Sequence, residues 1–240
     1  MRLDAFLAGR EKISRTKCKE LILAGKVKVE GKAALKPSLL LDGGEKVEVE
    51  PAEVFVSRGA LKLKAALEAF SPLGLSVSGK LCIDVGASTG GFTQVLLARG
   101  ARAVIALDVG RGQLSSLLRK DPRVKNMEGV NIRYLDSSSL PFPPSFASAD
   151  LSFISLDLAF PKISEIESVK DCVALVKPEF EAGRGGLGKG GVVRDGKVRA
   201  ECLNKAEEAA RRAGFSVLSR MPSPILGEKG NEEFLIWAHR

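Results

Sequence analysis

The segment Leu81–Phe92 reads LCIDVGASTGGF and indicates how the larger part of the chain folds. An apolar run that includes Asp84 predicts a buried strand, and the helical pattern GFTQVLLARG begins at Gly91. Between them stands a turn rich in glycine, the residue that lets a backbone bend sharply and lets other groups approach it closely. A strand, a glycine-rich turn and a helix in this order are typical of sheets that bind ligands at the carboxyl ends of their strands. We therefore expect a ligand site at this turn.

The same alternation continues towards the C-terminus. Helical patterns, of which Val198–Ala213 is the longest, separate a series of strand patterns. This alternation predicts a doubly wound, mostly parallel α/β sheet of the Rossmann-like type, and the short interval between the last two strands predicts an antiparallel hairpin. A helix GALKLKAALEAF (59–70), with Ser57 as its N-cap, precedes the sheet, and GQLSSLLRK (112–120) is a helix within it. The predicted strands are LCIDV (81–85), AVIALDV (103–109), VKNMEGV (124–130), SADLSFISL (148–156), CVALVKPEF (172–180), GFSVLSRM (214–221) and EFLIWA (233–238).

Composition narrows the class of partner. The 240-residue chain carries a formal net charge of +8, which favours a polyanion such as nucleic acid. Aromatic residues make up only 5% of it, so we expect phosphate contacts and shape recognition rather than base stacking. Four single cysteines predict buried thiols and no metal site, and His239 is the only histidine, so catalysis is expected to proceed without one. The charged N-terminus is unlike a signal peptide and no apolar run approaches the ~20 residues that cross a bilayer, so a cytoplasmic location is expected.

The first 36 residues hold ten Lys or Arg against four Asp or Glu, so the basic charge is local. Two helical patterns, from Leu3 and from Ser14, lead into short strand patterns at KVKVEGKAAL (26–35) and DGGEKVEVE (42–50). This arrangement resembles the alpha-L (S-four-type) RNA-binding module, although a solvated helix face would give the same charge pattern. We expect an RNA-binding domain over residues 1–52, a linker over 53–60 and the α/β domain over 61–240. The expected RNA contacts are Arg2, Arg15, Lys17, Lys19 and Arg58.

The glycine-rich turn does not match the two common phosphate-binding motifs. A dinucleotide fingerprint needs glycine where Ser88 stands, and a P-loop needs lysine where Phe92 stands. An uncharged turn with a bare backbone instead suits a ligand whose carboxylate and ribose approach a helix N-terminus, and S-adenosylmethionine is such a ligand. We therefore predict S-adenosylmethionine as the cofactor, with Asp84 bracing the turn. The predicted contacts in the turn are Gly86, Ala87, Ser88, Thr89, Gly90, Gly91 and Phe92.

Acids and an amide follow the next strands. Asp108 ends the second strand, where an acid can accept hydrogen bonds from both ribose hydroxyls. After the third strand, Asn131 or Asp136 could meet the adenine edge, or either could be a turn or cap residue. A second glycine-rich segment, Gly183–Gly191, lacks the Ser or Thr with which a P-loop holds magnesium. We interpret this segment as a mobile loop over the site.

Four ionisable residues are expected near the same strand ends, and any one of them could be a solvated charge. They are a lysine, an aspartate, a lysine and a glutamate in chain order, which resembles the tetrad of the RrmJ/FtsJ class of RNA 2′-O-ribose methyltransferases. Lys177 is the least ordinary of them, because it interrupts an apolar run before a proline. The four are Lys62, Asp150, Lys177 and Glu233, with Lys64 and Glu232 as adjacent alternatives.

Nearly the whole chain resembles the TlyA (hemolysin A) family. The front module and the segments SRGALKL, DVGASTGGFT, DVGRGQL, ADLSFISL, LVKPEFE and GNEEF carry this resemblance. It implies S-adenosylmethionine-dependent methylation of cytidine riboses in the ribosomal RNA of one or both subunits, with no metal. ADLSF stands where base amino-methyltransferases have a DPPY-like motif, which favours ribose oxygen over base nitrogen. The alternatives are a membrane-active hemolysin and a catalytically silent rRNA-binding assembly factor.

The tetrad suggests a mechanism without histidine. A lysine can take the proton of a ribose hydroxyl where burial or a neighbouring cation lowers its pKa from ~10.4 towards neutrality. We expect Lys177 to be this base, with Lys62 nearby, Asp150 to orient the lysine or the hydroxyl, and Glu233 to balance the charge. Most of the rate enhancement is expected from holding the attacking oxygen in line with the methyl group.

Overall fold

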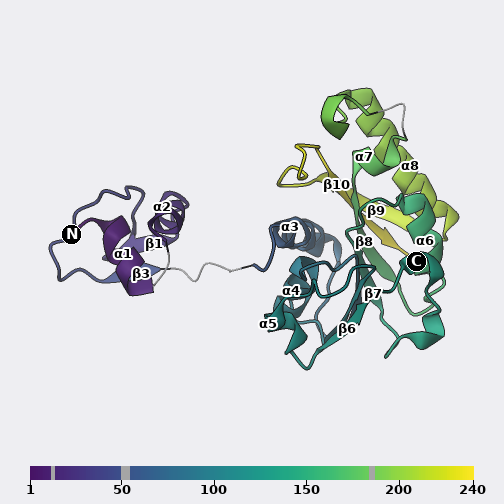
Figure 1. The fold of residues 1–240 in the computed structure, drawn as a ribbon, viewed down its shortest axis with the longest axis horizontal. Coiled ribbons are helices and arrows are strands. Elements are labelled where there is room, and N and C mark those ends of the chain that lie inside the picture. The colour runs from purple at the N-terminus through teal and green to yellow at the C-terminus, as the bar shows by residue number, and fades with distance from the viewer. Residues whose placement is uncertain (12–13, 50–54, 184–186) are drawn as a thin grey trace. The chain divides into compact units, whose positions relative to one another are not determined.

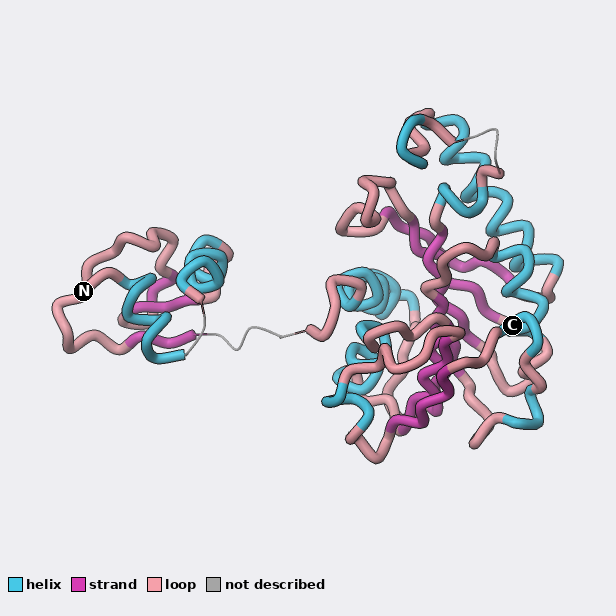
Figure 2. Tube along the Cα trace, viewed as in Figure 1, coloured by secondary structure: helices cyan, strands magenta, loops and turns pink. Residues whose placement is uncertain are grey.

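The computed structural model describes residues 1–11, 14–49, 55–183 and 187–240, and these form two compact units, Met1–Val54 and Phe55–Arg240 (Figures 1 and 2). Residues 50–54, where the predicted domain boundary falls, lie outside the described residues. Residues from 55 onwards already belong to the larger unit: Phe55 and Val56 pack against its core, and the Val56 amide donates to Gln94 Oε1 at 2.8 Å.

The smaller unit consists of two helices packed on a short antiparallel sheet. Its core contains Leu3, Leu7, Cys18, Ile22 and Val27, contributed by both helices and by the central strand. This matches the order of elements expected from the sequence, although the strands are shorter than their patterns. The elements are α1 (Leu3–Glu11), α2 (Arg15–Leu23), β1 (Val27–Val29), β2 (Lys32–Ala33) and β3 (Val47–Val49), with sheet order β2-β1-β3.

The larger unit is built on a seven-stranded sheet of order β6-β5-β4-β7-β8-β10-β9. Neighbouring strands from β6 to β8 pair in parallel, and β10 pairs antiparallel with β8 and β9. The predicted doubly wound sheet with a C-terminal antiparallel hairpin is therefore confirmed. The strands are β4 (Leu81–Val85), β5 (Ala103–Asp108), β6 (Val124–Glu128), β7 (Phe146–Ala149), β8 (Asp171–Val176), β9 (Ser216–Pro222) and β10 (Phe234–His239).

Helices cover both faces of this sheet (Figure 1). Because successive strand residues point to opposite faces, Cys82 joins the core under α3 and α4, whereas Ile83 joins the core under α6 and α8. The α-helices are α3 (Ala60–Phe70), α4 (Gly91–Ala98), α5 (Ser116–Arg119), α6 (Leu156–Ser164), α7 (Pro178–Glu181) and α8 (Gly196–Arg212). Short 3₁₀ helices lie at η1 (Ser71–Leu73), η2 (Ile132–Tyr134), η3 (Ser137–Ser139) and η5 (Lys189–Gly191).

Several element boundaries differ from those predicted. The fourth strand pattern ends at Ala149, because Phe153 adopts φ +65° and Ser155 then caps α6 through the Asp157 amide. The fifth ends at Val176, because Pro178 begins α7. The helix predicted over 112–120 is confined to Ser116–Arg119, since Glu128 binds the amides of residues 113 and 114 outside it.

The predicted N-cap role of Ser57 is wrong. Helix α3 begins after Gly59, which is itself helical and offers no side-chain cap. Ser57 Oγ instead lies only 2.2 Å from where a side-chain carbon at Gly91 would stand, so it packs against the start of α4.

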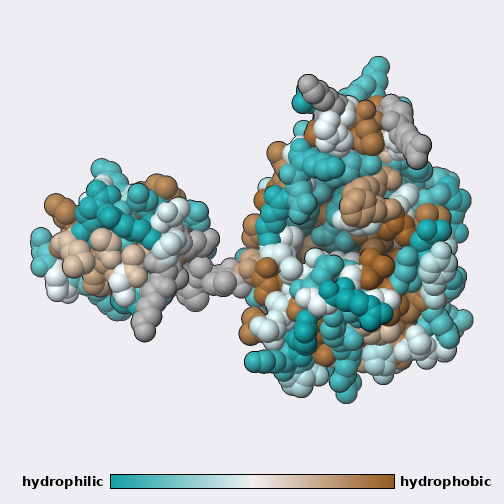
Figure 3. Space-filling model, in the orientation of Figure 1, coloured by the Kyte–Doolittle hydropathy of each residue, from teal (hydrophilic) through white to brown (hydrophobic). Residues whose placement is uncertain are grey.

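The described helices include none that is both long and apolar enough to span a bilayer. On the face of the larger unit seen in Figure 3, hydrophilic and hydrophobic residues are interspersed.

Candidate active site

The glycine-rich turn follows β4 and leads into α4. Gly86 and Gly90 have φ of +87° and +97°, a conformation that side chains disfavour. A side-chain carbon at Gly86 would lie 2.4 Å from the carbonyl oxygen of Asp150, and one at Gly90 would lie 2.2 Å from Leu118 Cδ1. The bare backbone is therefore required by the packing of β7 and α5 against the turn, whatever ligand approaches it.

Asp84, in the strand before this turn, connects the elements that surround it. Its side chain is fully buried and accepts hydrogen bonds from Thr93 Oγ1 at 2.7 Å and from Ser148 Oγ at 3.0 Å. It thereby ties β4 to α4 and to β7. Burial, opposed by these two hydrogen bonds, raises the pKa of Asp84 to about 7.

One cavity, of about 450 Å³, lies between the turn and the ends of β5 and β6. Asp108 lines it and accepts from the amides of Ser88 and Gly110, both at 2.7 Å. Asn131 also lines it, but its side chain caps η2 by accepting from the Arg133 amide at 3.0 Å. The remaining walls are mainly apolar, formed by Leu107, Val109, Val130, Ile132, Leu151 and Ile154.

Asp136 does not reach the place expected for it. It caps η3 by accepting from the Ser138 amide and hydroxyl at 2.9 and 2.8 Å, and it is absent from the linings of both cavities beside the turn. The cap role, which the sequence left open, is the one that the structure supports.

A second cavity, of about 430 Å³, lies on the other side of the turn, and all four tetrad residues line it. Lys177 Nζ forms an ion pair with Asp150 Oδ1 at 2.6 Å and lies 3.1 Å from Ser152 Oγ. Lys62 Nζ forms an ion pair with Glu233 Oε2, and both side chains are more than nine-tenths buried. The structure therefore joins the tetrad as two lysine–carboxylate pairs.

The sheet topology produces this convergence. Asp150 and Lys177 each follow the last residue of neighbouring parallel strands, β7 and β8. Because β10 runs antiparallel to β8, its first residues lie at the same edge, which brings in Glu233, while the first turn of α3 supplies Lys62. Burial raises the pKa of Glu233, against the opposing effect of Lys62.

The adjacent alternatives lie elsewhere. Lys64 Nζ stands 5.9 Å from the centre of the Phe55 ring, and Glu232 is exposed and pairs with Arg199 at 3.2 Å. Helical periodicity explains the first difference, because residues two apart on α3 point in different directions. Glu232 and Glu233 both precede β10, and only Glu233 is buried.

Phe153 also lines both cavities and was missed by sequence reasoning. The residue is 92% exposed, and its φ of +65° is unusual for a bulky residue. Its ring centre lies 5.3 Å from that of Phe180. No signal in SADLSFISL distinguishes it from an inward-facing strand residue.

The residues expected to contact RNA have different surroundings. Arg2 and Arg15 both bind the buried carboxylate of Asp4, with nitrogen–oxygen distances of 3.1 Å, and their side chains remain about half exposed. Arg58 is exposed and lines the tetrad cavity. Lys19 is exposed on α2, and the side chain of Lys17 lies outside what the structure describes.

The second glycine-rich segment is described at residue 183 and from residue 187 onwards. Asn231, which is fully buried, accepts from the Val193 amide at 2.8 Å and donates to the Gly191 carbonyl at 3.1 Å. The predicted mobility of Gly183–Gly191 stays a prediction, since residues 184–186 lie outside the described part. Within the described part, no three His, Cys, Asp or Glu residues gather as a metal-ligand set.

Comparisons with known proteins show the family to which the chain belongs. Residues 55–240 match the family model of FtsJ-like methyltransferases, and residues 1–47 match that of the S4 domain. The chain is 43% identical over 240 residues to the 16S/23S rRNA (cytidine-2′-O)-methyltransferase TlyA of Mycobacterium tuberculosis, and the alignment covers 98% of this chain and 88% of that relative. Among solved structures, a protein described as a hemolysin from Streptococcus thermophilus has 41% identity and a TM-score of 0.74 over 100% of this chain and 88% of that one. An S-adenosylmethionine-dependent methyltransferase from Listeria monocytogenes is similar in fold alone, with 16% identity and a TM-score of 0.54 over 75% of this chain and 99% of that one.

Proposed function

Because the chain belongs to the FtsJ-like methyltransferase family and, within it, to the TlyA (hemolysin A) group, we propose that it methylates the ribose 2′-oxygen of cytidine in ribosomal RNA. The observation that carries this proposal is the meeting of two lysine–carboxylate pairs in one cavity beside the glycine-rich turn. The name of the relative from Mycobacterium tuberculosis supports the substrate, and the N-terminal match to the S4 domain supports an RNA partner.

The residues of the larger unit fit S-adenosylmethionine as the methyl donor. Apolar side chains form a slot for an adenine ring, and Asp108 stands at the strand end where it can accept from ribose hydroxyls. The turn that begins at Gly86 lines both cavities, so a ligand held by it reaches from the slot to the tetrad. The cofactor supplies a methyl group carried on a positively charged sulfur.

Lys177 is the proposed base. In its neutral form, its Nζ takes the proton of the ribose hydroxyl while that oxygen forms the bond to the methyl carbon, and the carbon–sulfur electron pair stays with the sulfur. Asp150, 2.6 Å from Nζ, stabilises the ammonium group that results and keeps the side chain directed into the cavity. Lys62 and Glu233 offset one another's charge, so before the proton moves the tetrad carries the single negative charge of Asp150, and protonation of Lys177 then balances it.

Two further features of the cavity suit a nucleotide. Glu179 lines it, and Glu179 Oε2 is buried with no hydrogen-bond partner among the described residues, so it is free to accept from a substrate hydroxyl or amino group. Phe153 exposes its ring at the mouth, where a base can stack on it.

The test uses tritiated S-adenosylmethionine with unmodified small and large ribosomal subunits, each incubated separately with wild type and with Lys177→Ala. The labelled RNA is then hydrolysed in alkali, which does not cleave next to a methylated 2′-oxygen. We expect label in alkali-resistant dinucleotides with wild type, and its loss with the variant. Label in mononucleotides would mean base methylation and overturn the proposal.

Two other outcomes distinguish the alternatives. Cofactor binding without transfer to either subunit would favour a catalytically silent rRNA-binding factor. Leakage of dye from liposomes in the presence of the pure protein would favour a membrane-active hemolysin.

A further inference from the structure

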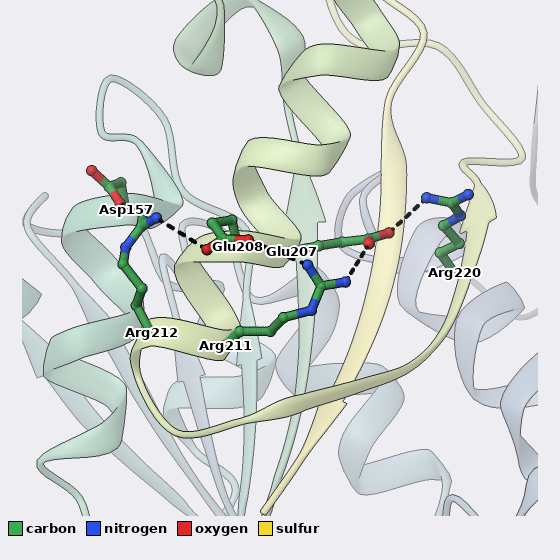
Figure 4. Close-up of polar contacts among 6 residues, drawn as sticks. All are labelled: Asp157, Glu207, Glu208, Arg211, Arg212 and Arg220. Carbon is green, nitrogen blue, oxygen red and sulfur yellow. Dashed lines mark hydrogen bonds and ion pairs between the residues drawn. The ribbon is translucent and has the colours of Figure 1, made fainter.

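Two groups of exposed cations in the larger unit differ in their partners, and the first is neutralised by acids. Arg211 and Arg220 bind the two oxygens of Glu207 at 3.2 and 2.8 Å, and Arg212 binds Asp157 at 2.5 Å (Figure 4). These arginines lie on α8 and β9 and line neither cavity beside the turn. An RNA phosphate that approached them would have to compete with a carboxylate already in place.

Arg194 and Lys229 form the second group. Both are exposed, and within the described part of the chain neither side chain has a hydrogen bond or ion pair. Both line a groove of about 440 Å³ that also includes Arg199 and Glu232. Those four residues carry three positive charges and one negative charge, so the groove is basic.

This groove adjoins the tetrad cavity, because Lys229 lines both. The segment from Gly227 to Glu233 connects them along the chain, and Glu233 is the carboxylate paired with Lys62. A polymer whose ribose enters the tetrad cavity therefore has the groove next to it, where the neighbouring phosphates of the same strand would lie.

The walls of the groove are fixed by a buried amide. Asn231 joins its two rims, because it hydrogen-bonds Gly191 and Val193 on one side while its own segment carries Lys229 on the other. Arg199 adds to this by donating to the carbonyls of Val193 and Arg194, at 3.2 and 2.8 Å, and by pairing with Glu232. These hydrogen bonds order the backbone that carries Arg194 and Lys229 before RNA binds. Less entropy is therefore lost when a phosphate chain binds there.

We propose that this groove binds the phosphate backbone of the RNA strand next to the target nucleotide, with Arg194 and Lys229 as the phosphate contacts. The inference rests on the proposed function, because it assumes that a ribose of RNA occupies the tetrad cavity. It adds a contact surface on the larger unit to the one expected on the smaller unit.

The test measures the affinity for unmodified ribosomal subunits over a range of salt concentrations. Arg194→Ala, Lys229→Ala and the double variant are compared with wild type, and Arg212→Ala is the matched control because that arginine is also exposed but is paired. Each single variant is expected to weaken binding and to reduce the slope of log K against log salt by about 0.7, and the double variant by about twice that. For Arg194→Ala, whose side chain lines the groove and not the tetrad cavity, S-adenosylmethionine affinity and the rate at saturating RNA are expected to stay at the wild-type level.

The outcomes separate this inference from the proposed function. Slopes equal to those of wild type and of Arg212→Ala would overturn the phosphate groove even if methyl transfer were normal. If wild type binds the subunits but transfers no methyl group, the proposed function fails, while the change in slope still decides whether the groove contacts phosphates.

Discussion

Lys177 and Asp150 form an ion pair in the cavity, and this pairing permits a sharp test of the proposed base. An arginine at position 177 could keep the pair with Asp150, but a guanidinium is not deprotonated in proteins and cannot accept a proton. We therefore expect Lys177→Arg to lose methyl transfer as completely as Lys177→Ala, by about 10²- to 10⁴-fold in kcat. Single-turnover rates with bound cofactor measure this directly. Substantial activity in the arginine variant would show that the residue acts only through its charge.

Asp84 gives the larger unit a dependence on pH. Its pKa is raised to about 7, whereas the unfolded chain loses this proton near the usual 3.8. Between those values the folded state binds the extra proton, so this residue's contribution to the free energy of unfolding falls as the pH rises, by up to ~4 kcal/mol. In Asp84→Asn the amide can accept from Thr93 and donate to Ser148, and this fall is expected to disappear.

Urea unfolding at about pH 5 and about pH 8, followed by the fluorescence of the single tryptophan, Trp237, measures the difference. Trp237 lies in β10, so the signal reports on the larger unit alone. Equal changes with pH in wild type and Asp84→Asn would contradict the raised pKa.

At the scale of single residues, the sequence predicts where a side chain lies better than it predicts which other side chain it contacts. Lys177 stands out because it interrupts an apolar strand pattern, and the structure does place it at a strand end in the cavity. That Asp150 forms an ion pair with the lysine, where the sequence left open whether it orients the lysine or the hydroxyl, depends on the order of strands in the sheet, which single residues do not encode. The sequence also does not predict the role of Phe153 or the phosphate groove. Both depend on how turns distant in the chain come together in the fold.

At the scale of elements, the loops after β7 and β8 are tied together by Glu181. This carboxylate is 4% exposed and accepts from Ser155 Oγ at 2.5 Å and from the Leu156 amide at 2.8 Å, at the start of α6. It ends α7, which follows Lys177 directly, whereas Ser155 closes the loop that carries Asp150. The link therefore fixes the two strand ends that carry Asp150 and Lys177 relative to one another.

We expect Glu181→Gln to lower kcat by about tenfold, because an amide keeps one acceptor and loses the other, and the ion pair at the strand ends is then held less firmly. Stability is expected to fall by about 1–2 kcal/mol. Steady-state kinetics and urea unfolding measure both. Glu165→Gln, which removes an exposed carboxylate paired with Lys162 at the other end of α6, is the control and should leave kcat unchanged.

Elements with long periodic patterns are the ones that the sequence predicts well. The alternation of strands and helices was sufficient for the sheet class, because each strand from β4 to β8 is flanked by an apolar helix or loop that must cover it. The residues at which these elements end are predicted less well. SADLSFISL and CVALVKPEF look like longer strands than β7 and β8, since nothing in their apolar spacing marks where the chain leaves the sheet to build the site.

In the whole molecule, cofactor binding and RNA binding are expected to involve the two units differently. The expected cofactor contacts and the tetrad lie within residues 55–240, and the basic stretch of residues 1–36 lies in the smaller unit. We expect residues 55–240 alone to bind S-adenosylmethionine with the affinity of the full chain, because the residues lining both cavities belong to this unit. Its slope of log K against log salt for ribosomal subunits should fall by up to about 3, since Arg2, Arg15, Lys17 and Lys19 are four expected phosphate contacts at about 0.7 each. The fall is smaller if the carboxylate of Asp4, which pairs with both arginines, competes with phosphate. Calorimetry and filter binding measure the two quantities, and unchanged Trp237 fluorescence controls for folding. A fragment that binds and methylates the subunits like the full chain at every salt concentration would mean that the larger unit, through its own basic groove, recognises RNA unaided.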